Sequence, residues 1–297
     1  MNTFLIKIGI ICFVLLFFDM AWSQSTLEAF LKPADSLHVY RRNAVVISET
    51  VLFVGGIMQI NKPFNSDHSI AKFHCINDNL KCLQIDKFAH MFSSYQIGSL
   101  SYNALQWSGV SQRNKLIFGA GMGFVFLTSV EMFDGFNKGT SFGDIAANAV
   151  GISLFISQEL LWKEQRIIPK YSFRPMGPNS ADIFSTDLGK MKYNVGCEFD
   201  AQTFWLSVNL HSFFKQSALP KWLNLATGYG VEGISGAIVQ TSPYRQLYFS
   251  FDVDLSKIKT HSHLLKTLFY VFNTIKIPAP TIEVSSFGHT KWHLLYF

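Results

Sequence analysis

The sequence predicts an α+β protein in which a bundle of about four apolar helices precedes a β-rich C-terminal region with one amphipathic helix. Apolar segments of helical length fill the first half of the chain, and a stretch rich in Pro, Ser and Gly follows Pro169. Beyond it, apolar and polar residues alternate with the period of a strand. We therefore divide the chain into a signal peptide (1–23), a helical bundle (24–168), a linker (169–182) and a β-rich region (183–297).

Residues 1–23 have the features of a signal peptide. One lysine precedes the apolar stretch Ile8–Phe18, and small residues just before Gln24 suit cleavage there. The apolar core has only about half the length needed to span a bilayer, which argues against an uncleaved anchor. Because Cys12 lies inside this core and not at the cleavage point, the sequence does not predict a lipid-anchored N-terminus. We expect an exported protein of the bacterial cell envelope.

The composition favours contact with a membrane. Hydrophobic residues make up 48% of the chain, which includes 29 phenylalanines. The net charge of +5 is spread along the chain without a run of Lys and Arg, so we exclude nucleic acid as a partner. Membrane lipid or envelope glycan are the partners that we expect, with a periplasm-facing location and the outer membrane as one alternative.

Four apolar segments have helical character, after a short amphipathic segment at Leu27–Leu37. They run over Ala44–Ile60, Asp86–Trp107, Asn114–Asp134 and Phe142–Trp162. The last three are long enough to cross a bilayer or to form long bundle helices. In the third segment, the spacing of Gly119 and Gly123 lets another helix approach closely.

The C-terminal region reads as strands around one helix. Apolar residues fall on one face of Phe204–His211 and of Tyr248–Leu255, as in half-buried strands. Weaker strand candidates are Leu223–Val231, Thr281–Ser285 and Lys291–Phe297. The segment His263–Ile277 has the pattern of an amphipathic helix, which could cover the sheet or lie on a membrane. Too few strands are visible to predict a closed barrel.

Polar residues inside the apolar helices form the candidate site. They occur in three pairs with spacings of four, three and four, which place each pair on one helical face. All three pairs lie at corresponding helix ends, so an up-and-down arrangement would bring them together. The six residues are Asp86, His90, Glu131, Asp134, Asp144 and Asn148.

Two of these acids have simple structural explanations, whereas two others do not. Asp86 would suit an N-cap, and Ser141 with Asp144 matches the capping box. Glu131 and Asp134 lie at a helix C-terminus, where the helix dipole disfavours negative charge. These two carboxylates therefore need a cation or a proton nearby.

Two alternatives for the charge balance stay open. His90, Lys87 and Lys138 could pair with the carboxylates in an internal hydrogen-bonded network. A divalent metal held by His90, Glu131 and Asp134 is the less favoured alternative, because the sequence contains no strict metal motif. The cofactor and the catalytic residues are therefore left open.

Cys75 and Cys82 flank a short polar loop in a compartment where disulfides persist, which makes them the disulfide candidate. Cys197 would then remain as a buried, inert thiol.

Three segments carry a family resemblance. Asp86–His90, Glu131–Gly135 and Ser141–Asp144, with Asn148 and Gly151, resemble in order and spacing the YfiM-like family of predicted bacterial periplasmic lipoproteins. That family has no characterised biochemical role, so the resemblance implies an envelope location and no reaction. The short motif Asp86–His90 also resembles the VanZ-like membrane proteins.

The C-terminal region extends the first resemblance. Gln202–Ser207, Gly228–Gly230 and Lys276–Thr281 resemble the longer Bacteroidetes-type members of the YfiM-like family. The chain departs from the lipoprotein form because it lacks the lipidated cysteine.

The sequence favours a noncatalytic envelope protein that binds or organises lipid or glycan through its helical bundle. The alternative is a metal-assisted envelope hydrolase in which Glu131 or Asp134 acts as base or ligand beside His90. The sequence alone therefore leaves open whether the protein is an enzyme.

Overall fold

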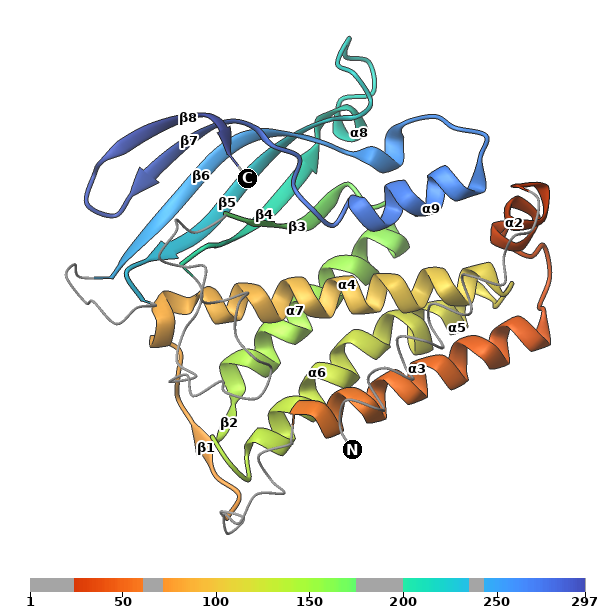
Figure 1. Cartoon of the computed structure of the whole chain (residues 1–297), viewed down its shortest axis with the longest axis horizontal. Coiled ribbons are helices and arrows are strands. Elements are labelled where there is room, and N and C mark those ends of the chain that lie inside the picture. Colours follow the sequence, from red (N-terminus) through yellow and green to blue (C-terminus); the bar gives the residue numbers. More distant parts are fainter. Residues whose placement is uncertain (1–23, 61–71, 175–199, 235–242, 297) are drawn as a thin grey trace.

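The computed structural model describes residues 24–60, 72–174, 200–234 and 243–296. It shows a layer of helices beneath one antiparallel sheet (Figure 1), which confirms the mixed helix and sheet composition. The predicted signal peptide and Cys197 lie outside the described residues, and the domain boundaries stay predictions.

The long helices occur where the sequence places them. They are α3 (Val39–Ile60), α4 (Ile85–Trp107), α6 (Gly121–Asp134) and α7 (Phe142–Leu161), with the short α2 (Gln24–Leu31) in front. A short helix, α5 (Gln112–Asn114), and a π-helical turn, η3 (Lys115–Ala120), lead directly into α6. Helix α4 is central, because it packs on α7, η3 and α6 and also touches the sheet.

The glycines of the third apolar segment bring α6 close to α4, as predicted. A Cβ atom at Gly123 would lie 2.1 Å from the carbonyl oxygen of Ser94, and one at Gly119 would lie 2.8 Å from Cα of Tyr102. A Cβ atom at Gly121 would meet nothing within 4 Å. Only the two glycines that face α4 are therefore required by the packing.

A closed four-helix bundle is not confirmed, because α3 lies at the margin of the helical layer. It contacts α4 and α6, but much of its apolar surface faces outward, and Leu52 is 71% exposed. Within the part of the chain that the structure describes, Gln112–Asp134 is long and apolar enough to cross a membrane. One such helix does not by itself show a membrane protein.

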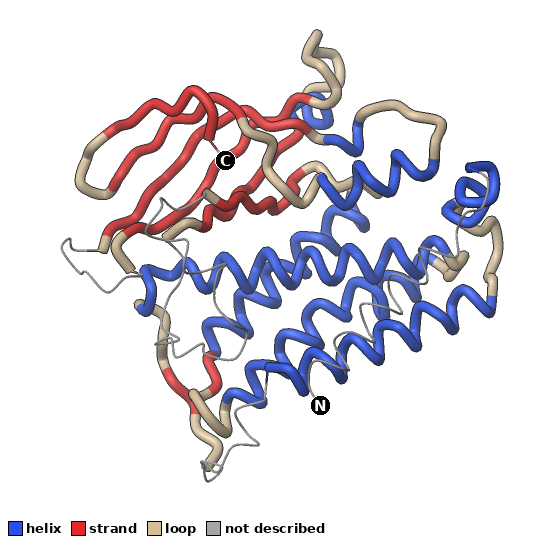
Figure 2. The backbone as a smooth tube through the Cα atoms, viewed as in Figure 1, coloured by secondary structure: helices blue, strands red, loops and turns tan. Residues whose placement is uncertain are grey.

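The sheet is an up-and-down meander in which every strand pairs with its neighbours in sequence (Figure 2). Its strands are β3 (Ile167–Phe173), β4 (Gln202–Asn209), β5 (Leu223–Glu232), β6 (Tyr244–Val253), β7 (Ala279–Ser285) and β8 (Thr290–Tyr296). The short helix α8 (Leu210–Phe213) follows β4, and η5 (Leu255–Lys257) with α9 (His263–Phe272) follows β6. The predicted strands are thereby confirmed, with small shifts of their ends. The amphipathic helix is also confirmed, although it ends at Phe272 and not at Ile277.

Residues 169–173, at the start of the predicted linker, belong to strand β3. Pro169 is tolerated there because β3 is an edge strand, and it pairs only with Leu206 of β4. The alternation that marks a strand is hidden because Lys170, a charged residue, is completely buried.

The sheet has an inside-out distribution of polarity. In β6, Tyr248 and Asp252 are buried, whereas Phe249 and Phe251 are 49% and 54% exposed. The predicted alternation is present, but its apolar face is turned outward. The sheet curls so strongly that the hydroxyl of Tyr296 in β8 lies 3.0 Å from that of Thr203 in β4.

The interior of the curled sheet holds a fully buried ion pair. Lys170 Nζ lies 2.8 Å from Asp252 Oδ2, and both side chains are 0% exposed. The ammonium also donates to the carbonyl oxygen of Val253 at 2.8 Å. Asp252 accepts from the Ser207 hydroxyl at 2.6 Å and from the Ile277 amide at 3.1 Å. The two charges are therefore both paired and hydrogen-bonded, as burial requires.

Part of the outer face of the sheet is covered by the first turns of α4. Ile85 of α4 packs with Phe204 and Val231, and the ring of Phe88 stacks on Tyr229 with centroids 4.4 Å apart. This contact fixes the position of the N-terminal end of α4, which carries several residues of the polar cluster.

The predicted disulfide between Cys75 and Cys82 is wrong. Cys75 lies in β1 (Cys75–Ile76), which pairs in parallel with β2 (Thr140–Ser141), and it is a free, exposed thiol. Cys82 lies in the turn η2 (Lys81–Gln84) and is disulfide-bonded. The two cysteines are separated because pairing holds Cys75 on Thr140, while Cys82 packs against the Ile85 cluster beneath the sheet.

Candidate functional site

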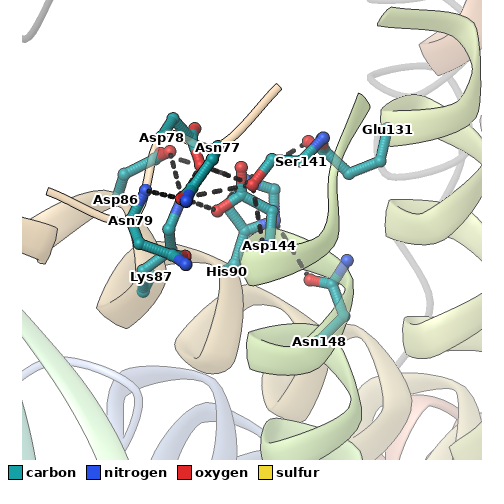
Figure 3. Close-up of polar contacts among 10 residues, drawn as sticks. All are labelled: Asn77, Asp78, Asn79, Asp86, Lys87, His90, Glu131, Ser141, Asp144 and Asn148. Carbon is teal, nitrogen blue, oxygen red and sulfur yellow. Dashed lines mark hydrogen bonds and ion pairs between the residues drawn. The ribbon is translucent and has the colours of Figure 1, made fainter. Parts of the chain in front are cut away.

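The polar cluster forms where the loop before α4 meets the start of α4, the end of α6 and the start of α7 (Figure 3). Five of the six residues selected from the sequence come together there: Asp86, His90, Glu131, Asp144 and Asn148. Asp134 is the exception, because no described residue of the cluster forms an ion pair with it. Helical spacing alone therefore does not determine which residues belong to the site.

The start of α7 is fixed by a capping interaction. The hydroxyl of Ser141 accepts a hydrogen bond from the amide of Asp144 at 3.2 Å, as the capping-box pattern predicts. In α4, however, the N-cap is Gln84, so the N-cap interpretation of Asp86 is wrong. Asp86 lies in the first turn, where it is free to face the cluster.

Lys87 neutralises one half of the cluster. Its Nζ lies 2.7 Å from Asp78 Oδ1 and 2.6 Å from Asp144 Oδ1. Burial alone would raise the pKa of Asp78, but hydrogen bonds from Lys87 and Ser141 together lower it. Sequence reasoning missed Asp78 because it lies in a polar loop, where an acidic residue is common. The one sequence signal for Asp78 is that it lies shortly before Asp86–His90, a segment that carries the family resemblance.

His90 occupies the other half of the cluster. Its Nδ1 lies 3.1 Å from the side-chain oxygen of Asn148. An amide oxygen can only accept, so this contact is a hydrogen bond in the tautomer that carries the proton on Nδ1. The opposite nitrogen, Nε2, lies 3.6 Å from Glu131 Oε1 and 3.9 Å from both Asp86 Oδ1 and Asp144 Oδ1. His90 therefore directs one nitrogen toward three carboxylates.

Glu131, Asp86 and Asp134 hold protons more tightly than an exposed carboxyl group does. Burial raises the pKa of Glu131 to about 7, an effect that the charge of His90 opposes and that of Asp144 reinforces. Burial also raises the pKa of Asp86, with a further contribution from Asp144. For Asp134, burial raises the pKa while Lys138 opposes the change. A proton on Glu131 can therefore supply part of the charge balance.

The same geometry can accommodate a divalent cation. One ligand atom each from Asp86, His90 and Asp144 lie within 4.8 Å of one another. This set differs from the predicted one, because Asp86 and Asp144 take the places of Glu131 and Asp134 beside His90. Glu131 lies next to the set, with its Oε1 3.6 Å from Nε2 of His90. The donor set of carboxylate oxygens and one imidazole nitrogen suits a divalent metal.

Fold and site together define an α+β protein with a buried acid-rich cluster at one end of its helical layer. Residues 76–158 match the model of a family described as predicted periplasmic lipoprotein (DUF2279). The match includes every residue of the cluster, confirms the predicted resemblance over this segment and supports an exported, envelope location. It stops before the sheet, and the similarity to VanZ-like proteins stays a prediction. Comparison with curated proteins and with solved structures found no match.

Proposed function

We propose that this is a noncatalytic, membrane-associated protein of the cell envelope that contacts lipid acyl chains through exposed apolar surfaces. The observation that carries the proposal is the inside-out polarity of the sheet. A sheet that faces water buries its apolar side chains and exposes its polar ones. Here the charged pair Lys170 and Asp252 is inside, whereas phenylalanine side chains face outward.

The outward apolar residues are neighbours on the sheet and form a continuous surface. Phe249 pairs with Ile282, which in turn pairs with Trp292 on β8. In the next row, Phe251 pairs with Leu225. Four of these residues are exposed, and Trp292 is 76% exposed. An apolar outer face with a polar interior is the pattern of sheets that contact lipid.

The helical layer adds apolar surface of the same kind. Exposed side chains occur on α3, η3 and α7, among them Leu52, Phe118, Leu160 and Leu161. These surfaces favour lipid over glycan, because aliphatic and phenyl side chains offer no hydrogen bonds to sugar hydroxyls. Association of this type requires no element to span the bilayer.

Vesicle flotation tests the proposal. The purified protein is mixed with neutral phosphatidylcholine vesicles, and we expect it to float with them. A double variant, Phe249→Gln with Phe251→Gln, should lose most of this binding, because the glutamines make insertion costly. The matched control carries Lys259→Gln and Lys266→Gln at exposed positions away from the sheet face. A wild-type protein that stays unbound, or a Phe variant that floats like the control, would overturn the proposal.

A second candidate function, a metal-assisted envelope hydrolase, is favoured by the orientation of His90. Metal-binding histidines commonly donate their second ring nitrogen to a polar partner, as His90 does to Asn148. Asp86, His90 and Asp144 would hold the ion, and Glu131, with its pKa of about 7, would be suited to act as a base. The pairing of Asp144 with Lys87 places this function second, because it already satisfies one ligand.

Metal content decides between the two functions. The wild-type protein, His90→Ala and Asp134→Asn are purified under identical conditions, and folding is verified by circular dichroism. The hydrolase candidate predicts a stoichiometric divalent ion that is lost in the His90 variant and kept in the Asp134 control. Absence of metal from the folded wild-type protein after incubation with divalent ions would eliminate it.

A further inference from the structure

Helix α3 is held against the helical layer at two points. Near its start, the guanidinium of Arg41 lies over the ring of Trp107, 4.6 Å from the centroid. Near its end, Phe53 packs edge-on against Phe126, with centroids 5.4 Å apart. Between these two contacts, a groove of about 520 Å³ separates α3 from α4 and α6. Its size falls within the range of small-molecule sites.

Most side chains that line the groove are apolar. Its walls include Val45, Leu52 and Phe53 from α3, with Ile97 and Leu100 from α4. Such a lining would accept a hydrocarbon chain and would gain from its burial. The contacts at both ends hold α3 near its neighbours, which leaves no room for a helix of about 10 Å diameter.

Three polar side chains line the groove, Ser48, Glu49 and Ser101, and the last two have buried polar atoms. Glu49 and Ser101 are close enough for Ser101 to lower the pKa of Glu49, but neither Oε1 of Glu49 nor Oγ of Ser101 makes a well-formed hydrogen bond to a described residue, and Ser101 is only 4% exposed. Burial has the larger effect and raises the pKa of Glu49, which the hydrogen-bonding contact with Ser101 only partly offsets. Because buried polar atoms are normally paired, these two atoms point to a ligand with a polar end.

We infer that the groove binds a neutral single-chain amphiphile, with its acyl chain between α3 and α4 and its hydroxyl end facing Glu49 and Ser101. A hydroxyl donates to the carboxylate and accepts from Ser101, so both unpaired atoms gain a partner. A fatty-acid carboxylate would instead place two negative charges in an apolar groove. This inference rests on the proposed contact with lipid. It adds that the groove in the helical layer prefers a neutral single-chain lipid.

The experiment compares two soluble probes with the same chain, monodecanoylglycerol and decanoate, by calorimetry on the delipidated full chain. Both are kept below their micelle concentrations at about pH 8, where the carboxyl group of free decanoate is ionised. We expect the glyceride to bind about tenfold more tightly than decanoate. In Glu49→Gln, this preference should fall to about threefold or less, because the repelling charge is gone.

Two further variants test the location. Ala104→Phe places a ring in the groove and should weaken glyceride binding about tenfold or more. Ile47→Phe adds the same ring at an exposed position of α3 outside the groove and should bind like the wild type. If Ala104→Phe does not fold, Ala44→Phe on the opposite wall replaces it.

The results separate this inference from the general proposal. Equal affinity of the wild type for the two probes, no glyceride binding, or unchanged binding in the folded groove variant would overturn the inference. Ala104→Phe should still float with vesicles. A wild-type protein that floats but does not bind glyceride overturns the groove alone, whereas one that binds glyceride but does not float overturns the surface proposal alone.

Discussion

Replacing Lys170 with methionine tests the inside-out interior of the sheet. Methionine keeps most of the side-chain volume but removes the ammonium that lies 2.8 Å from Asp252 and donates to Val253. Removal of one partner from a buried ion pair costs about 3–5 kcal/mol, because the other charge remains buried without compensation. That is a large part of the stability of a typical domain, which is about 5–15 kcal/mol.

A second buried lysine moderates the effect. Burial lowers the pKa of Lys276 to about 8, although Asp252 opposes this change and Lys170 reinforces it. Without Lys170, Lys276 loses a repelling neighbour and becomes the main counter-charge for Asp252. We therefore expect a loss near the lower end, about 3 kcal/mol, together with a higher pKa of Lys276.

Equilibrium urea unfolding in mild detergent, followed by tryptophan fluorescence, measures the loss. Lys259→Met, at an exposed position, is the control and should change the free energy of unfolding by no more than about 0.5 kcal/mol. Adding Asp252→Asn to Lys170→Met removes the uncompensated charge and should recover part of the loss. A cost below about 1 kcal/mol for Lys170→Met, or simple additivity in the double variant, would refute the reasoning.

Three shorter predictions concern the helical layer. Gly123→Ala should lower the free energy of unfolding by about 1–3 kcal/mol through a backbone clash, whereas Gly121→Ala should be neutral or stabilising, as urea unfolding will show. The pKa of Glu131 is raised from 4.5 to about 7 on folding, so its contribution to the free energy of unfolding is complete below about pH 4.5 and is lost as the pH rises through 7. Urea unfolding at a series of pH values should show this loss, of up to about 3 kcal/mol, in the wild type but not in Glu131→Gln. Cys75→Ser should remove one equivalent of maleimide labelling under non-reducing conditions, and unchanged labelling would contradict the free, exposed thiol.

Much of the secondary structure follows from local pattern. Long apolar segments predict the helices because length and composition suffice, and the Gly119 and Gly123 spacing predicts the close contact with α4. The alternation in β6 predicts a strand, but a period of two does not say which face is buried. That choice depends on Lys170 of β3 meeting Asp252 of β6, two strands that are not neighbours in the sheet.

The candidate site shows the same division between local and long-range information. Helical spacing brings together the residues on α4 and α7, since His90 and Asn148 lie on facing turns. It cannot reveal Asp78, whose position depends on the loop and on Lys87. Nor can it separate Glu131 from Asp134, because a shift of one helical turn decides which carboxylate reaches His90.

The up-and-down order of the sheet bears on how the protein folds after export. Each strand finds its partner nearby in sequence, so pairing can proceed strand by strand without a long-range search. The contact between Lys170 of β3 and Asp252 of β6 forms only once the intervening strands β4 and β5 have curled the sheet. If it closes after the rate-limiting step, its loss will speed unfolding while leaving the refolding rate nearly unchanged. The ion pair would then slow the unfolding of the sheet and so determine how long the folded sheet persists, without changing how quickly it forms.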